Sequence, residues 1–314
     1  MATLPSPSAP GLVRTAAIPH LASWDFVLSA ADGYPLAARL WAVADTTGSA
    51  AAVINAGAGI SMRYYDDFAR FLAINDIPTL LYDYRGIGNS RPNRLRGFQA
   101  SVEDWGSKDC AAALNWLGEK FPFANRIVIG HSVGGFVTGF VTNGVSISRM
   151  LLIGAHTGYW RDYAQGPRVG MYLLWHGLMP IVTRIVGYFP GRRLHLLDDL
   201  PQGVALEWAG RRKPEFWWNK VAPDGAPDVE WRDDAIRRFL AIRADTLAVR
   251  FSDDAFATEA ATARILSLYR NCPATPMVIR PVDVGGQKVG HFGFFRSRFS
   301  DVLWPRVLQW LRGI

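Results

Sequence analysis

The sequence predicts an α/β fold, in which helices flank a mostly parallel central sheet. From about residue 24, short apolar runs alternate with amphipathic stretches that have helical spacing. The apolar runs are continuous, as expected for parallel strands that are buried on both faces. Residues 158–244 break this alternation and are helical where they show any pattern, so we expect them to form a helical cap inserted after the sixth strand.

The expected elements follow in chain order. Strands at residues 24–29 and 36–44 surround a Gly- and Pro-containing turn, which is typical of an antiparallel hairpin. Ser101 and Asp104 resemble a capping box that begins a helix. The remaining strands are expected at 51–55, 79–84, 126–130, 149–153, 246–251 and 277–280, and the helices at 64–75, 101–120, 134–142, between the last two strands, and 300–311. We therefore expect an arm (1–23), a core (24–157 and 245–314) and a cap (158–244).

Composition excludes several classes of protein. With 314 residues, 49% of them hydrophobic and 19% charged, the chain is compact rather than disordered or of low complexity. Its two cysteines, Cys110 and Cys272, are too few for a disulfide framework or a Cys-rich zinc site. The net charge of +7 is spread along the chain rather than gathered in one stripe, so we expect no nucleic-acid partner.

The sequence shows neither a signal peptide nor a membrane-spanning segment. Residues 1–20 are rich in Pro, Ala and Ser and lack a basic start followed by an apolar run, so we expect a flexible arm and no signal peptide. The longest apolar stretch, residues 171–189, is interrupted by His176, Pro180 and Arg184. We therefore expect no transmembrane segment and a cytoplasmic protein.

The most informative motif is the segment from Gly130 to Gly134, which reads Gly-His-Ser-Val-Gly. It follows a β-branched strand and opens a helix, the context that a nucleophile elbow requires. Such a turn exposes the Ser132 hydroxyl above the carboxyl end of the sheet. It also places the Val133 N–H at a helix N-terminus, where it can donate to a developing oxyanion.

Together with the segment Asp83-Tyr84-Arg85-Gly86-Ile87-Gly88-Asn89-Ser90, this elbow resembles the α/β-hydrolase superfamily. Within it, the chain is similar to serine hydrolases related to monoacylglycerol lipases and S33-type peptidases. The resemblance covers about residues 24–157 and 246–312 and implies an α/β-hydrolase fold with a catalytic serine triad. It also implies that Asp83 and Arg85 support loops and core rather than chemistry.

The resemblance implies a second oxyanion donor in the loop after the third strand. There the segment Ala56-Gly57-Ala58-Gly59 stands where the family commonly has His-Gly-x-Gly, and Ala58 would supply the N–H. The family's histidine is replaced by Ala56. Asn55 is a candidate for anchoring the loop in its absence, and an ordinary Gly-rich turn is the alternative interpretation.

A serine nucleophile needs a base and an orienting carboxylate. His291 lies in a Gly-flanked loop before the last helix, whereas His156 comes too early for the family's order of serine, acid and histidine. His131 lies inside the elbow and is expected to point elsewhere. For the acid, related sequences favour Asp254, with Asp253 as the alternative.

These residues predict a serine hydrolase that cleaves a carboxylic ester through an acyl-enzyme on Ser132, with a small-molecule substrate whose acyl part is apolar. The apolar run at residues 171–179 is either packing against the core or the wall of an acyl pocket. An acyltransferase, a thioesterase, a peptidase or amidase, and a non-catalytic binding protein remain alternatives. Neither a metal site nor a dinucleotide fingerprint is present in the sequence, so we expect no cofactor.

Overall fold

The computed structural model describes residues 21–44, 46, 48–211 and 228–313. Most of the predicted arm lies outside this range, as do residues 212–227 of the predicted cap.

An eight-stranded sheet forms the centre of the described chain, in the order β1-β2-β4-β3-β5-β6-β9-β10. The first two strands pair antiparallel as a hairpin and β2 also pairs antiparallel with β4, while the strands from β4 to β10 in this order run parallel. The predicted fold class is confirmed. The bounds are β1 Leu21–Ser29, β2 Pro35–Val43, β3 Ala50–Asn55, β4 Thr79–Tyr82, β5 Asn125–His131, β6 Ile147–Ile153, β9 Asp245–Phe251 and β10 Ala274–Ile279.

One predicted boundary is corrected at the start of the chain. Residues 21–23 were expected in the arm but belong to β1, because Leu21 is paired with Val43 at the far end of the hairpin.

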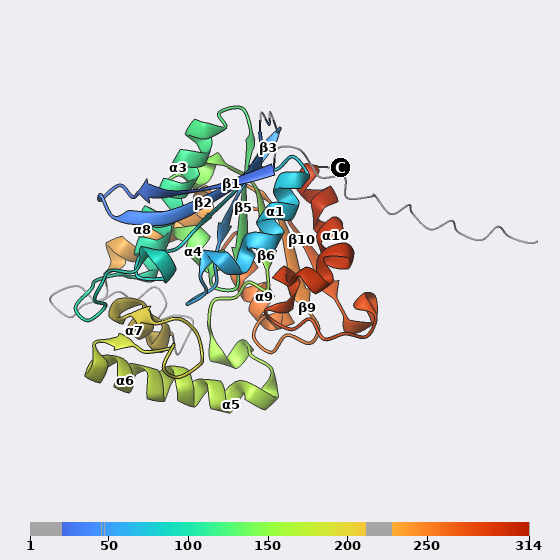
Figure 1. The fold of residues 1–314 in the computed structure, drawn as a ribbon. Coiled ribbons are helices and arrows are strands. Elements are labelled where there is room, and N and C mark those ends of the chain that lie inside the picture. The colour runs from blue at the N-terminus through green and yellow to red at the C-terminus, as the bar shows by residue number, and fades with distance from the viewer. Residues whose placement is uncertain (1–20, 45, 47, 212–227, 314) are drawn as a thin grey trace, which may run out of the picture.

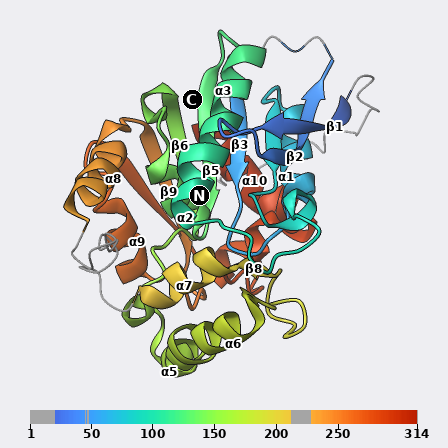
Figure 2. The ribbon, with the colours of Figure 1, turned by 90° about the vertical axis from the view of Figure 1, so that its left-hand side faces the viewer.

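Helices cover both faces of the sheet (Figures 1 and 2). α1 and α10 pack together through Phe68, Phe71 and Trp304. α3, α4 and α8 lie on the other face, where the Phe239 ring of α8 lies against the Phe136 ring of α4. The bounds are α1 Asp66–Ile74, α2 Val102–Asp104, α3 Ala111–Lys120, α4 Gly134–Val137, α8 Val229–Ala241, α9 Glu259–Leu266 and α10 Ser300–Arg312.

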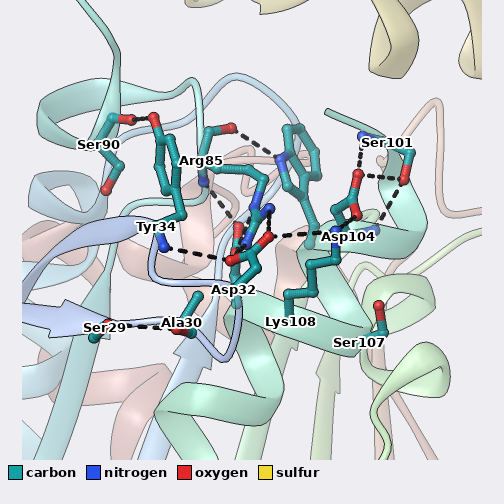
Figure 3. Close-up of polar contacts among 12 residues, drawn as sticks. Ser29, Ala30, Asp32, Tyr34, Arg85, Ser90, Ser101, Asp104, Ser107 and Lys108 are labelled. Atoms are coloured by element: carbon teal, nitrogen blue, oxygen red, sulfur yellow. Dashed lines mark hydrogen bonds and ion pairs between the residues drawn. The ribbon is translucent and has the colours of Figure 1, made fainter. Parts of the chain in front are cut away.

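The segment that follows β4 ties the hairpin to the helical layer. The buried Arg85 guanidinium pairs with Asp109 at 2.7 Å. It also pairs with Asp32 of the hairpin turn at 2.7 Å (Figure 3). Asp83 accepts the backbone N–H groups of Met62 at 2.7 Å and Asn89 at 2.8 Å. Both side chains thus support loops and core, as the sequence suggested, and neither lines the cavity described below.

The cap lies beyond the carboxyl ends of the parallel strands (Figure 1). α5 Gln165–Leu173 continues through a π-helical turn, Leu174–Leu178, into α6 Met179–Val186. α7 Gln202–Gly210 packs against α6, and a two-stranded ribbon of β7 Tyr188–Phe189 and β8 Leu200–Pro201 was not predicted. Although its sequence falls in the range predicted as cap, α8 packs mainly on the core turns that follow α4.

Residues 165–186 form the one helix among the described residues that could cross a membrane by length and composition. Its inner face is occupied, because Trp175, Met179 and Thr183 are buried within the molecule. The predicted absence of a membrane span stays a prediction.

Candidate active site

Ser132 stands on a strained turn between β5 and α4. Its φ of 55° is left-handed, which is uncommon for a residue with a side chain and is typical of a nucleophile elbow. The glycines at either side relieve different crowding. A Cβ on Gly130 would lie 2.7 Å from the Cα of Gly135, and a Cβ on Gly134 would lie 2.1 Å from the carbonyl oxygen of Asn55. Gly134 therefore lets the elbow approach the end of β3 closely.

The predicted serine, histidine and carboxylate meet at this turn from three distant segments. His291 Nε2 lies 2.9 Å from Ser132 Oγ, and His291 Nδ1 lies 2.8 Å from Asp254 Oδ2. All three residues are buried. With Nδ1–H donating to the carboxylate, Nε2 is free to accept the serine proton, which is the geometry of a nucleophile, a base and an orienting acid.

Local contacts keep the Asp254 carboxylate ionised. Burial by itself raises its pKa, but the hydrogen bond from His291 and the N–H groups of Phe256 and Ala257 lower the pKa below its ordinary value. Those two N–H groups donate to Oδ1 at 2.7 and 3.1 Å. Asp253 instead accepts the N–H groups of residues 289 and 290 and so holds the loop that carries His291.

The two predicted oxyanion donors come from the elbow and from the loop after β3. Val133 caps the N-terminus of α4, and Ala58 lines the cavity above Ser132. Within the described part of the chain, neither backbone N–H donates to another residue. Gly57 brings the loop close, because a Cβ there would meet Ser132 Cβ at 3.4 Å and the Ile60 side chain at 2.8 Å.

A buried chain of hydrogen bonds holds this loop, which has Ala56 where the family that it resembles commonly has a histidine. The N–H of Gly57 donates to the Tyr65 hydroxyl at 2.9 Å, and that hydroxyl donates to His131 Nδ1 at 2.8 Å. His131 Nε2 in turn donates to the carbonyl of His291 at 3.0 Å. Burial and the nearby His291 lower the pKa of His131 to about 3, so its ring is neutral. The oxyanion loop, the elbow and the histidine loop are thereby joined.

Asn55, the last residue of β3, also anchors the loop that follows it. Its amide group donates to Thr138 Oγ1 at 2.8 Å, and its carbonyl accepts from the Tyr82 hydroxyl at 2.6 Å. The sequence suggested an anchoring function for Asn55 but gave no signal for Tyr65, because a tyrosine on an amphipathic helix is indistinguishable from core packing.

A cavity of about 510 Å³ opens above Ser132, between the core and the cap. Its size is within the range of small-molecule sites. The wall that the cap supplies is mostly apolar and consists of Tyr163, Met171, Leu174, Trp175, Met179, Leu196, Leu197, Leu200 and Trp208. The core supplies the polar floor around Ser132 and His291.

His156 is a residue of this floor that sequence reasoning set aside. Its Nε2 lies 3.2 Å from Ser132 Oγ, so two imidazoles contact one hydroxyl. In the described residues, no three histidine, cysteine or acidic side chains are grouped so that they could hold a metal ion.

The family model for S33 serine aminopeptidases matches residues 47–183. No curated protein sequence matches the chain.

Solved structures show the same fold at low sequence identity. An esterase of Pyrococcus furiosus is 14% identical with a TM-score of 0.59, and the match covers 98% of this chain and 96% of that one. A thermophilic esterase from Thermogutta terrifontis is 15% identical with a TM-score of 0.58, over 92% of this chain and 98% of the other. An acetyl xylan esterase from Paenibacillus sp. R4 is 17% identical with a TM-score of 0.54, over 95% and 87%.

These matches confirm the resemblance that the elbow and the segment after β4 had indicated. The chain therefore has the α/β-hydrolase fold, and its residues 47–183 are similar to the S33 serine aminopeptidases.

Proposed function

We propose that this protein is a serine esterase that cleaves a carboxylic ester with an apolar acyl part. The observation that carries the proposal is the hydrogen-bonded series Ser132, His291 and Asp254 at the floor of the cavity. The fold alone would not support it, since this fold serves many functions.

In the first half of the proposed reaction, His291 Nε2 takes the proton of Ser132 as Oγ attacks the ester carbonyl carbon. The carbonyl oxygen becomes an oxyanion and accepts the N–H groups of Ala58 and Val133. Asp254 stabilises the imidazolium. The bond to the alkoxy oxygen then breaks, and His291 gives its proton to the departing alcohol.

In the second half, water repeats the attack on the acyl-enzyme. His291 accepts a proton from the water, the oxyanion forms again between the same two N–H groups, and Ser132 Oγ leaves with the proton from His291. The apolar wall under the cap supports an apolar acyl group, because transfer of such a group from water into this cavity is favourable by about 0.8 kcal/mol for each buried methylene.

Labelling with a fluorophosphonate tests the proposal, since this reagent reacts with activated serines. We expect one adduct per chain, on the peptide that contains Ser132, and no adduct in Ser132→Ala. Ser107→Ala serves as the control, because the Ser107 hydroxyl donates to a helix carbonyl outside the cavity, and it should label like the wild type. A folded wild type that does not label would favour a binding protein on this scaffold.

A further inference from the structure

His156 lies in a short loop after β6 that the fold bends toward the nucleophile. Gly154 and Gly158 on either side both have left-handed φ values, 54° and 83°. A Cβ on Gly154 would be 3.3 Å from Asp254 Oδ2, so the loop begins against the acid and base pair. His156 is 3% exposed, and its ring faces those of Tyr163, Phe256 and Trp208.

The contacts of the His156 ring determine which of its two nitrogens is protonated. The backbone N–H of Gly158 lies 3.0 Å from His156 Nδ1 and can only donate, so Nδ1 is an unprotonated acceptor. Burial, together with the neighbouring His291, lowers the pKa of His156 to about 3. The ring is therefore neutral near pH 7 and carries its single proton on Nε2, the atom that faces Ser132 Oγ.

The two histidines consequently have opposite relations to the serine. His291 Nδ1 donates to the Asp254 carboxylate, so its Nε2 is the acceptor for the Ser132 proton. His156 Nε2 is a donor and cannot take that proton. Ser132 Oγ thus donates to one imidazole and accepts from the other.

From this arrangement we propose that His156 is a second catalytic histidine, which stabilises negative charge on Ser132 Oγ without exchanging a proton. This inference rests on the esterase proposal and deepens it. As the Oγ proton moves to His291 and the bond to the carbonyl carbon begins to form, charge increases on Oγ, and the His156 hydrogen bond strengthens. The same bond assists when Oγ is expelled from the acyl-enzyme and charge returns to it.

Only the strengthening of the bond accelerates the reaction, because the ground state already contains it. A hydrogen bond to a charged group is stronger than one between neutral groups, and the difference in free energy is enough to change a rate roughly tenfold. We therefore expect His156→Phe, which keeps a ring and loses the donor, to lower kcat for a p-nitrophenyl ester roughly tenfold with KM nearly unchanged. His156→Gln, which retains an N–H donor at similar reach, should recover most of the loss.

Several outcomes would overturn this assignment. These are a His156→Phe rate within twofold of wild type, equal losses in the Phe and Gln variants, or substantial activity in His291→Ala, which would make His156 the base. His176→Phe is the matched control for a buried histidine that does not line the cavity, and its kcat should stay within twofold.

Two further measurements keep the test decisive. If His156→Phe does not fold, His156→Leu replaces it in the kinetic comparison. Independently, ¹⁵N NMR of the wild-type protein should show the His156 ring as the neutral Nε2–H tautomer between pH 5 and 8. A protonated ring or the Nδ1–H tautomer would refute the donor. Activity in Ser132→Ala equal to wild type would instead refute the esterase proposal itself, so the two failures are distinguishable.

Discussion

Asp253 and Asp254 are neighbours in the chain, but their carboxylates contact different partners. Asp254 accepts a hydrogen bond from the His291 imidazole, whereas Asp253 accepts hydrogen bonds from two backbone N–H groups of the loop that carries His291. The sequence limits the acid that orients His291 to these two aspartates. It does not show which of them it is, because that depends on how the turn after β9 directs each side chain.

Substitution of each residue by asparagine separates the two functions. Asp254→Asn removes the charge that stabilises the imidazolium and favours the wrong tautomer, so kcat should fall roughly 10⁴-fold. Asp253→Asn retains an acceptor for the loop and should lower kcat far less. Steady-state ester hydrolysis measures both, and an equal loss in the two variants would contradict the assignment.

The lowered pKa of Asp254 also predicts a dependence of stability on pH. A carboxyl whose folded-state pKa is depressed below 3.8 stabilises the fold above that pH, and the contribution disappears as the pH falls through the folded pKa. Chemical unfolding of wild type and Asp254→Asn should therefore give free energies that differ at pH 7 and converge below about pH 4. A difference that does not change with pH would be inconsistent with the shift.

At the scale of elements, the strands were predicted well and the site only in part. Continuous apolar runs identify β3, β5, β6 and β9 because strands that are buried on both faces leave that pattern. The ribbon of β7 and β8 was missed, since strands of two residues have no periodicity. The Tyr65 hydroxyl contacts His131, 66 residues away, and His156 contacts Ser132, 24 residues away, so no local pattern could reveal either contact.

The close approach of the elbow to β3 gives a prediction about stability. A Cβ on Gly134 would lie 2.1 Å from a backbone oxygen that cannot move aside, so Gly134→Ala should destabilise the fold by about 1–3 kcal/mol. In Gly170→Ala, on a cap helix with nothing near the added methyl, stability should instead rise by up to about 1 kcal/mol. Urea unfolding of the two variants measures this contrast. Equal effects would exclude the steric argument.

At the scale of the whole molecule, the cap and the core together define the cavity, and the cap wall should set the preferred acyl length. Leu174 lines the cavity, whereas Leu173 on the same helix is 61% exposed on the outer side. Leu174→Trp should therefore shift the optimum of a p-nitrophenyl ester series toward shorter chains, and Leu173→Trp should leave it unchanged. Parallel shifts in both variants would mean that the acyl group does not lie under this helix.

The proposed function requires Ser132 to be the nucleophile of an ester hydrolase. Hydrolysis of p-nitrophenyl esters from acetate to long acyl chains should be measured for the wild type and Ser132→Ala. Turnover by the wild type that falls by about 10⁵-fold or more in the variant is the expected result. Folded wild type without turnover on any ester, or a Ser132→Ala variant that retains its rate, would contradict the claim.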